Sequence, residues 1–543
     1  MHTAKASSFK VLNWKRFLAK KALPFLIVLA LSVPFFSPHL FFGITDSLDM
    51  LNISVSAYEL GDLSSAVKTN LATGEQVKVY SKYGLGLPFL MAPNLFFYDL
   101  LSGIAPIEPD YVLGIFNVLM LALTASALNA VIIELGFGSR RALFLSVASV
   151  FGTFAFVYMN NFLSEPLQGL LLTLAFLFSL RQSRGAVYPA LSSLALSAMV
   201  LTKAASLVLA PFFIIYFLYR GVKEKALTRL VFFMLPLVAS GAAMMWLNQT
   251  RFGSPFDFGY GGEAAMFVNP ILNGLKDLLI NPGKGIIIYA PLSILLPFGL
   301  WRLSRTRPVE ALLIAALFAA NLILYSAWWA WEGADTWGPR FLLPLVPLVV
   351  APVAALLDGL IMKAAAAVLF AAGLAVNSLG VIVDPTAYNY LVMESTRDIA
   401  IDSVRPTRDY LEGNGELQPP PYVVTTELTD FNVLSGHYWI LKSRLKGAPM
   451  TQPPWLASYP ASELPLAGTL PEEIRIRLDC PAPLILSALS CPDKAPSSPY
   501  YYDAYTTQAS KAAALGMSEA AHRLNEKAKR GIDGKRLRLS QMR

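Results

Sequence analysis

Apolar residues along this chain gather into long blocks that are separated by short polar stretches, many of them basic. A helix needs about 17–25 mostly apolar residues to cross a bilayer. Blocks of roughly this length recur up to residue 383 and predict eleven membrane-spanning helices. The predicted spans are 22–42, 111–133, 142–158, 166–180, two within 188–219, 230–247, 285–301, 309–327, 341–357 and 364–383.

The stretch 188–219 is divided by Lys203 into two short apolar runs. A single span would place the basic group that follows, Arg220 to Arg229, on the outer face, whereas two spans return it to the cytoplasm. Because Lys and Arg favour cytoplasmic loops, we predict a pair of helices with Lys203 at the outer turn.

The distribution of basic residues orients the predicted bundle. Segments assigned to the cytoplasm hold more than twice as many Lys and Arg residues as the longer segments assigned outside before residue 384. Such an asymmetry is the usual orientation signal of membrane proteins. It predicts a multi-pass protein of the plasma (inner) membrane, with a cytoplasmic N-terminus and a last span that ends on the outer side.

Two regions are predicted to lie outside the bilayer. Residues 44–110 form a first outer loop, in which the proline-interrupted apolar patch 85–101 predicts an interfacial helix. Residues 384–543 alternate proline-rich and short apolar runs, which predicts a small extracytoplasmic domain of mixed or β-rich structure. The chain is therefore expected to be mainly α, with a transmembrane domain over 1–383 and this second domain after it.

The second domain holds the only two cysteines, Cys480 and Cys491. Disulfides persist in exported domains and are rare in the cytosol, so an outward location predicts a bond between them. The basic stretch 506–539 has helical composition. Such a helix either rests on anionic lipid headgroups or is solvated.

Composition and motifs exclude several classes of function. The net charge of +8 and a pI near 9.2 would suit nucleic-acid binding in a soluble protein, but 55% of the residues are apolar. The basic residues flank apolar blocks, where they act as topology signals, so no nucleic-acid partner is expected. A phosphate-binding P-loop and a His-Glu-x-x-His metal motif are both absent from the sequence.

The unusual residues of this sequence lie at the predicted outer ends of the spans. Ionisable groups at membrane depth are costly and are usually functional or paired. The alternative is that these loops are simply exposed to water, but Lys203 sits within apolar sequence and favours function. The residues concerned are Asp46, Glu165, Lys203, Arg251, Glu332, Asp335 and Arg340.

Several of these positions fall in motifs that resemble a known superfamily. The runs 46–49 (Asp-Ser-Leu-Asp) and 58–62 (Tyr-Glu-Leu-Gly-Asp) resemble the first outer loop of GT-C membrane glycosyltransferases. Within that class they are similar to protein O-mannosyltransferases and lipid A aminoarabinose transferases, which carry an acid after the first span. The resemblance makes Asp46 the equivalent acid, with Asp49 as the alternative.

Other motifs extend the resemblance over about residues 20–383. The run 80–84 resembles the lysine-containing juxtamembrane motif of the class, and 164–167, 251–255 and 337–340 resemble patterns of uncharacterised bacterial relatives. The second domain matches no pattern of the class, which leaves the acceptor open.

The resemblance implies a glycosyltransferase that moves a sugar from a polyprenyl-phosphate donor to an extracytoplasmic glycan, lipid or protein, with inversion. Membrane lipids and that donor are its expected partners. Asp46 or Asp49 would act as general base, because an acceptor hydroxyl must lose its proton. The leaving phosphate needs fixed cations, for which the candidates are Arg340, Lys203, Arg251 and Lys82. The candidate substrate-binding residues are Tyr83, Glu165, Tyr260, Glu332, Asp335 and Trp337.

Three questions stay open from the sequence. A divalent metal is possible because several carboxylates lie on one side, but they follow no fixed ligand spacing. Trp328 and Trp329 suit an interfacial aromatic belt as well as sugar stacking. The same charges could instead line the path of a transporter or lipid-linked-sugar flippase, although such proteins often show repeated halves and this sequence does not. A non-catalytic assembly subunit is a third possibility.

The predicted topology can be tested with the two cysteines. We expect Cys480 and Cys491 to react with a membrane-impermeant thiol reagent on intact cells, but only after reduction, because both lie outside and are bonded to each other. Labelling that requires cell disruption would reverse the orientation of the last span.

Overall fold

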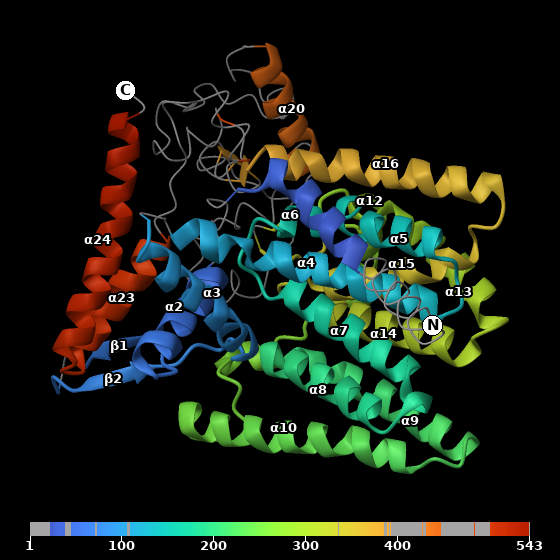
Figure 1. Cartoon of the computed structure of the whole chain (residues 1–543), viewed down its shortest axis with the longest axis horizontal. Helices are drawn as coiled ribbons and strands as arrows, with labels where there is room; N and C mark the ends of the chain where they lie inside the picture. The colour runs from blue at the N-terminus through green and yellow to red at the C-terminus, as the bar shows by residue number, and fades with distance from the viewer. Residues whose placement is uncertain are drawn as a thin grey trace, which may run out of the picture.

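The computed structural model describes residues 22–37, 45–70, 73–105, 109–334, 336–384, 388–389, 391–392, 426, 431–446, 480, 483 and 500–541. The described chain is mostly helical, and its long apolar helices run side by side along the horizontal axis of Figure 1. The first outer loop and the C-terminal helices gather at the left end of this bundle.

The bundle contains helices and short 3-10 segments (η) in the order of the predicted spans. They are Ala22–Phe35, α4 (Pro109–Glu134), α5 (Ser139–Phe151), α6 (Ala155–Tyr158), α7 (Glu165–Leu180), α8 (Val187–Thr202), η3 (Ala204–Leu209), α9 (Ala210–Lys223), α10 (Thr228–Phe252), α11 (Ile271–Ile280), α12 (Ile286–Tyr289), η5 (Pro291–Leu295), α13 (Leu296–Ser304), α14 (Pro308–Ala327), η6 (Arg340–Leu345), α15 (Val346–Val350), η7 (Ala351–Ala355) and α16 (Leu360–Ile382).

Five of the described helices are long and apolar enough to cross a membrane, and they identify a membrane protein. Four shorter apolar helices accompany them: Ala22–Phe35, Glu165–Leu180, Val187–Thr202 and Arg340–Ala355. Within the described residues, each predicted span overlaps helical backbone, the first of them over 22–35. These helix lengths do not establish eleven crossings. The five long helices are Tyr111–Glu134, Ala204–Lys223, Thr228–Phe252, Pro308–Ala327 and Leu360–Ile382.

The division of residues 188–219 at Lys203 is confirmed. Helix α8 ends at Thr202, Lys203 itself is extended with φ −150° and ψ 110°, and η3 begins at Ala204. The chain therefore turns where the charged residue interrupts the apolar sequence.

Several predicted spans are not continuous α-helices, and three of them are divided into two or three pieces. Gly152 ends α5 before the short α6 begins. The eighth span is divided into α12, η5 and α13, and the tenth into η6, α15 and η7, with prolines at or near the start of most pieces. Proline lacks a backbone N–H and clashes with the preceding turn, so these apolar runs bend where a hydropathy pattern predicts a straight helix.

Charged residues collect at the two ends of the bundle. At one end, Glu134 pairs with Arg181 (2.8 Å) and Arg184 (2.6 Å), and Arg141 pairs with Asp358 (2.6 Å). These segments were all assigned to one side of the membrane from the sequence, and here they meet. We call this the arginine-rich end. The opposite end carries the first outer loop, and we call it the site end.

The first outer loop contains α2 (Thr45–Leu60), the antiparallel strands β1 (Ala66–Thr69) and β2 (Gln76–Val79), and α3 (Gly86–Ser102). Ala66 pairs with Val79 and Thr69 with Gln76. The predicted helix over 85–101 is present as α3. The β-hairpin was not predicted.

Beyond residue 384 the described elements are helices: α20 (Val433–Lys446), α23 (Tyr500–Ala514) and α24 (Ser518–Gln541). Helix α20 packs on α16, and α23 packs on α2 and β1. Strands of the predicted mixed or β-rich domain would have to lie outside the described residues. Cys480 is buried and disulfide-bonded, and Cys491 lies outside the described part of the chain.

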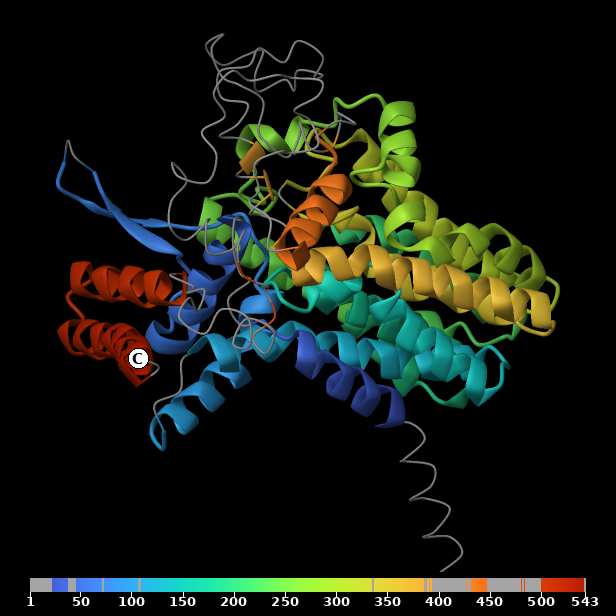
Figure 2. The ribbon, with the colours of Figure 1, turned by 90° about the horizontal axis from the view of Figure 1, so that it is seen from above.

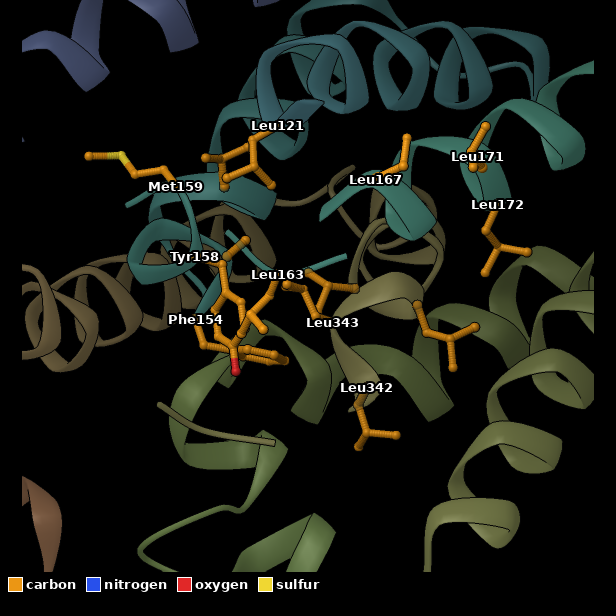
Figure 3. Packing of buried hydrophobic residues seen from close by; sticks show 14 of the residues in the cluster. Leu121, Phe154, Tyr158, Met159, Leu163, Leu167, Leu171, Leu172, Leu342 and Leu343 are labelled. Atoms are coloured by element: carbon orange, nitrogen blue, oxygen red, sulfur yellow. The ribbon is translucent and has the colours of Figure 1, made fainter. Parts of the chain in front are cut away.

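An apolar layer beneath the site end joins α4, α6, α7 and η6. Figure 3 shows Leu121, Tyr158, Leu167 and Leu343 from these four elements, and none is more than 4% exposed. Because the side chains interlock, η6 is fixed against α7 at the point where Arg340 begins it.

Close packing at Gly84 provides a test of the fold. A Cβ atom there would lie 2.3 Å from the Leu201 carbonyl oxygen and 2.4 Å from that of Thr202. We expect Gly84→Ala to cost about 1–3 kcal/mol of stability, as overpacking does, and to lower the melting temperature of the purified protein. The matched control is Gly241→Ala, which meets no atom within 4 Å. Equal melting temperatures for the two variants would contradict the packing.

Candidate active site

A cavity of about 460 Å³ lies at the site end. Its wall is mostly apolar and aromatic, with a few charged groups. The first outer loop, the turn at Lys203, the segment after α10 and the segment between α14 and η6 all contribute to it. The residues that line it include Asp46, Lys82, Tyr83, Lys203, Phe258, Tyr260, Glu263, Phe267, Tyr325, Trp328, Trp329, Glu332, Arg340 and Phe341.

Four charged side chains form a connected ion-pair chain at the base of the cavity. Arg340 Nη2 lies 2.6 Å from Asp46 Oδ2, and Arg340 Nε lies 2.9 Å from Glu165 Oε1. Lys203 Nζ reaches the same Glu165 oxygen at 3.2 Å. Glu165 is buried beneath the two cations and does not line the cavity. Two carboxylates therefore hold two cations in fixed positions.

The two candidate acids differ in their surroundings. Burial opposes ionisation of Asp46, but the Arg340 guanidinium and a hydrogen bond from the Tyr83 hydroxyl outweigh it and hold its pKa below the ordinary value. Asp49 accepts a hydrogen bond of 3.2 Å from Ser81 Oγ. Burial raises the pKa of Asp49, and the neighbouring charge of Asp46 adds to the rise. Only Asp46 lines the cavity.

The segment 80–86 brings two predicted residues to the cavity wall. The Tyr83 hydroxyl donates a hydrogen bond to Asp46 Oδ1. Lys82 Nζ pairs with Glu263 Oε2 at 2.6 Å and lies 5.5 Å from the centre of the Tyr260 ring. Arg251 does not reach the cavity. Its guanidinium donates to the carbonyl oxygens of Ser81 and Tyr83, the second at 3.2 Å, so it fixes the backbone of this segment.

The aromatic loop after α14 forms the opposite wall. Trp328 packs edge to face with Phe267 at 5.0 Å and with Tyr260 at 6.5 Å between ring centres. Buried Glu332 also lines the cavity. Trp337 points away from the cavity: it is 2% exposed and packs against Tyr289 and His437. Asp335 lies outside the described residues.

Seven of the predicted site residues thus line one cavity, and four described ones do not. The seven are Asp46, Arg340, Lys203, Lys82, Tyr83, Tyr260 and Glu332, and Trp328 and Trp329, whose role the sequence left open, line it too. Glu165 and Arg251 contact residues of the wall from behind, and Asp49 bonds to Ser81, which directly precedes the wall residue Lys82. Trp337 belongs to the packing of α16 and α20.

Sequence reasoning missed two charged residues of the site. Glu263 pairs with Lys82, and Lys284 is buried and donates to the Ala334 carbonyl oxygen at 3.0 Å and to Thr336. Lys284 directly precedes an apolar run, as a lysine at the membrane boundary commonly does, so its sequence position does not distinguish it. Glu263 sits in an ordinary polar loop and is not distinguished either.

Among the described residues, no three or more His, Cys, Asp or Glu side chains are grouped so that they could hold a metal ion. The metal expectation therefore remains open.

Comparison with known proteins finds similarity in structure only. No protein-family model matches the chain, and no curated protein matches it closely. ArnT from Cupriavidus metallidurans, solved with undecaprenyl phosphate, is similar over 79% of this chain and 71% of its own, at 15% identity and a TM-score of 0.44. AglB, the oligosaccharyltransferase of Archaeoglobus fulgidus solved with an inhibitory peptide and a dolichol-phosphate, is similar over 75% of this chain and 60% of its own, at 13% identity and a TM-score of 0.43.

Both neighbours are GT-C superfamily members, so the resemblance expected from the sequence is also found among solved structures. At TM-scores below 0.5 the likeness is distant. The functional interpretation therefore rests on the residues of this chain.

The ion-pair chain predicts a large difference between two carboxylates of the site. Glu165→Gln leaves Arg340 and Lys203 buried without their shared partner, and breaking such a pair costs about 3–5 kcal/mol. Glu263→Gln removes a pair that is about one-third exposed and should cost about 0–1 kcal/mol. Thermal unfolding of the purified variants measures both. Similar unfolding temperatures would refute the central role of Glu165.

Proposed function

We propose that this protein is a GT-C type glycosyltransferase that uses a polyprenyl-phosphate-linked sugar as donor and acts at the outer face of the membrane. The observation that carries the proposal is the cavity at the site end, where two fixed cations and an aspartate share an otherwise apolar and aromatic wall. A prenyl chain with a phosphate head matches both the apolar part and the cationic part of this wall.

Arg340 and Lys203 are the proposed phosphate ligands. Arginine binds phosphate oxygens bidentately, and lysine acts as a compact point charge. Both side chains are held from behind by Glu165, so their heads are positioned before the donor arrives. Preorganised cations stabilise the negative charge that develops on a leaving phosphate. Lys82 lines the same cavity and is a third candidate.

Asp46 is the proposed general base. The acceptor hydroxyl attacks the anomeric carbon as the bond from that carbon to the phosphate oxygen breaks, which inverts the configuration. Polyprenyl phosphate leaves with the bonding electron pair, and the hydroxyl proton passes to Asp46. In the free protein Arg340 and Tyr83 hold Asp46 ionised. When a phosphate oxygen competes for the Arg340 hydrogen bond to Asp46, Asp46 loses part of that stabilisation and becomes a stronger base.

The aromatic side of the cavity is the proposed place for the sugar and the acceptor. Tyr260 and Trp328 offer flat apolar faces, and Glu263 and Glu332 offer hydrogen-bond acceptors beside them. Asp49 supports this arrangement from behind through Ser81 rather than touching a substrate. These groups suit any acceptor that carries a hydroxyl group, whether it is a glycan, a lipid or a protein.

A transporter or flippase fits less well. Such a protein needs a path between its two faces. Here Glu165 is buried beneath the cavity and lines a second, separate cavity of only about 10 Å³. Below Glu165 lie the interlocked apolar residues of Figure 3. Closed packing beneath a charged cavity favours chemistry at one face.

The enzymatic proposal is tested by incubating purified protein with undecaprenyl-phosphate sugars and a membrane extract as acceptor, and by measuring released undecaprenyl phosphate. General-base catalysis contributes about 10²–10⁴-fold, so we expect Asp46→Asn to lower kcat by that factor. Asp49→Asn should retain most of the activity. Asp358→Asn, at the arginine-rich end, is the matched control and should be fully active.

Two outcomes would count against this assignment. Full turnover by a folded Asp46→Asn variant would move the base to Asp49 or Glu165. An unmodified protein that neither binds undecaprenyl phosphate in native mass spectrometry nor turns over any donor would end the glycosyltransferase proposal.

A further inference from the structure

The C-terminal hairpin of α23 and α24 lies against the outer side of the helix that carries Asp46. Helix α23 packs on α2 and on β1, and Figure 2 shows the hairpin beside the first outer loop. Tyr505, Ala512 and Leu524 are each no more than 1% exposed. The basic tail expected on headgroups or in solvent is therefore, over its first part, a buried element of the site end.

Lys511 is the most constrained contact of this hairpin. Its side chain is 1% exposed, and its ammonium group reaches Ser56 Oγ at 2.5 Å, the Ser64 carbonyl oxygen at 2.7 Å and Asp62 Oδ2 at 2.6 Å. An ammonium group has three N–H donors, so all three are used. Lysine is almost never fully buried unless it is paired, and this one fits a preformed set of oxygens.

Two more contacts lie on the same face of α2. Gln508 Nε2 donates to Asn52 Oδ1 at 3.2 Å, and Lys527 pairs with Glu59 and, at 2.6 Å, with Asp99. Asn52, Ser56 and Glu59 are spaced four and three residues apart, which places them along one side of a helix. The hairpin therefore holds α2 at three successive points.

The other end of α2 is held by a different set of contacts. Asp46 bonds to Arg340 and Tyr83, and both partners belong to the cavity wall. If a donor phosphate takes over the Arg340 hydrogen bond to Asp46, α2 loses a contact during turnover. A helix rises about 1.5 Å per residue, so the Ser56 contact lies about 15 Å from Asp46. A small tilt at the clamp moves the carboxylate by a distance that matters for proton transfer.

We propose that the C-terminal hairpin is a clamp that positions α2, and that Lys511 is its principal positioning residue. The functional part of this inference rests on the proposed glycosyltransferase activity. The structural part is independent of that activity: the contacts of Lys511 with residues 56–64 determine how firmly residues 45–60 are held.

The test uses the full-length protein with Lys511→Met, which keeps the length of the side chain and removes its charge. Hydrogen–deuterium exchange should become at least severalfold faster in peptides covering residues 45–60, with exchange in α4 and α7 unchanged. Lys529→Met is the matched control, because Lys529 is 67% exposed and contacts only Glu526 among the described ion pairs. Unchanged exchange over 45–60, or faster exchange throughout the bundle, would overturn the clamp.

Kinetics separate positioning from simple stabilisation. We expect Lys511→Met to lower kcat about 10–100-fold, as misplacement of a catalytic group does, with the donor KM within about twofold because Arg340 and Lys203 lie outside α2. Adding Asp62→Asn removes the carboxylate that has lost Lys511 but that Lys78 still reaches at 3.1 Å. It should restore part of the unfolding temperature but not kcat. Recovery of kcat together with stability would show that Lys511 only neutralises Asp62. Exchange needs no substrate, so it tests the clamp even if no donor is turned over.

Discussion

The ion-pair chain from Asp46 through Arg340 and Glu165 to Lys203 is the interaction on which the rest of the site end depends. Its members come from α2, η6, α7 and the turn after α8, which are distant in sequence. Charges in an apolar environment are costly unless they are paired and hydrogen-bonded. Each of these four segments therefore satisfies its charge only when the others are in place, so correct assembly of the bundle and formation of the site are one event.

Much of the bundle could be predicted because hydropathy reports where apolar segments begin and end. The break at Lys203 was found since a charge within apolar sequence is a strong signal. The pattern carries little information about backbone geometry inside a run, so the interrupted spans that contain η5 and η6 were missed. Those interruptions matter, because η6 turns Arg340 toward Asp46 at a point where a straight helix would continue.

The site was predictable where a residue stood out against apolar surroundings, as Asp46, Lys203 and Arg340 do. It was less predictable where direction decides the role. Arg251 lies in the last turn of the long apolar helix α10, yet its guanidinium turns to backbone carbonyl oxygens of the first outer loop. Trp337 shares a motif with Arg340 but faces the opposite way. Neighbouring side chains in a loop can point in opposite directions. Their spacing in the sequence does not predict which of them enters a cavity.

The close contact between Gly84 and the last turn of α8 has a mechanical consequence. The backbone that carries Tyr83 abuts the carbonyl groups just before Lys203, with no side chain between them to absorb movement. If Lys203 shifts on binding an anion, as proposed, the shift is passed through this contact to Tyr83, whose hydroxyl bonds to Asp46, the proposed base. The proposed anion position and the proposed base are thereby joined through rigid backbone.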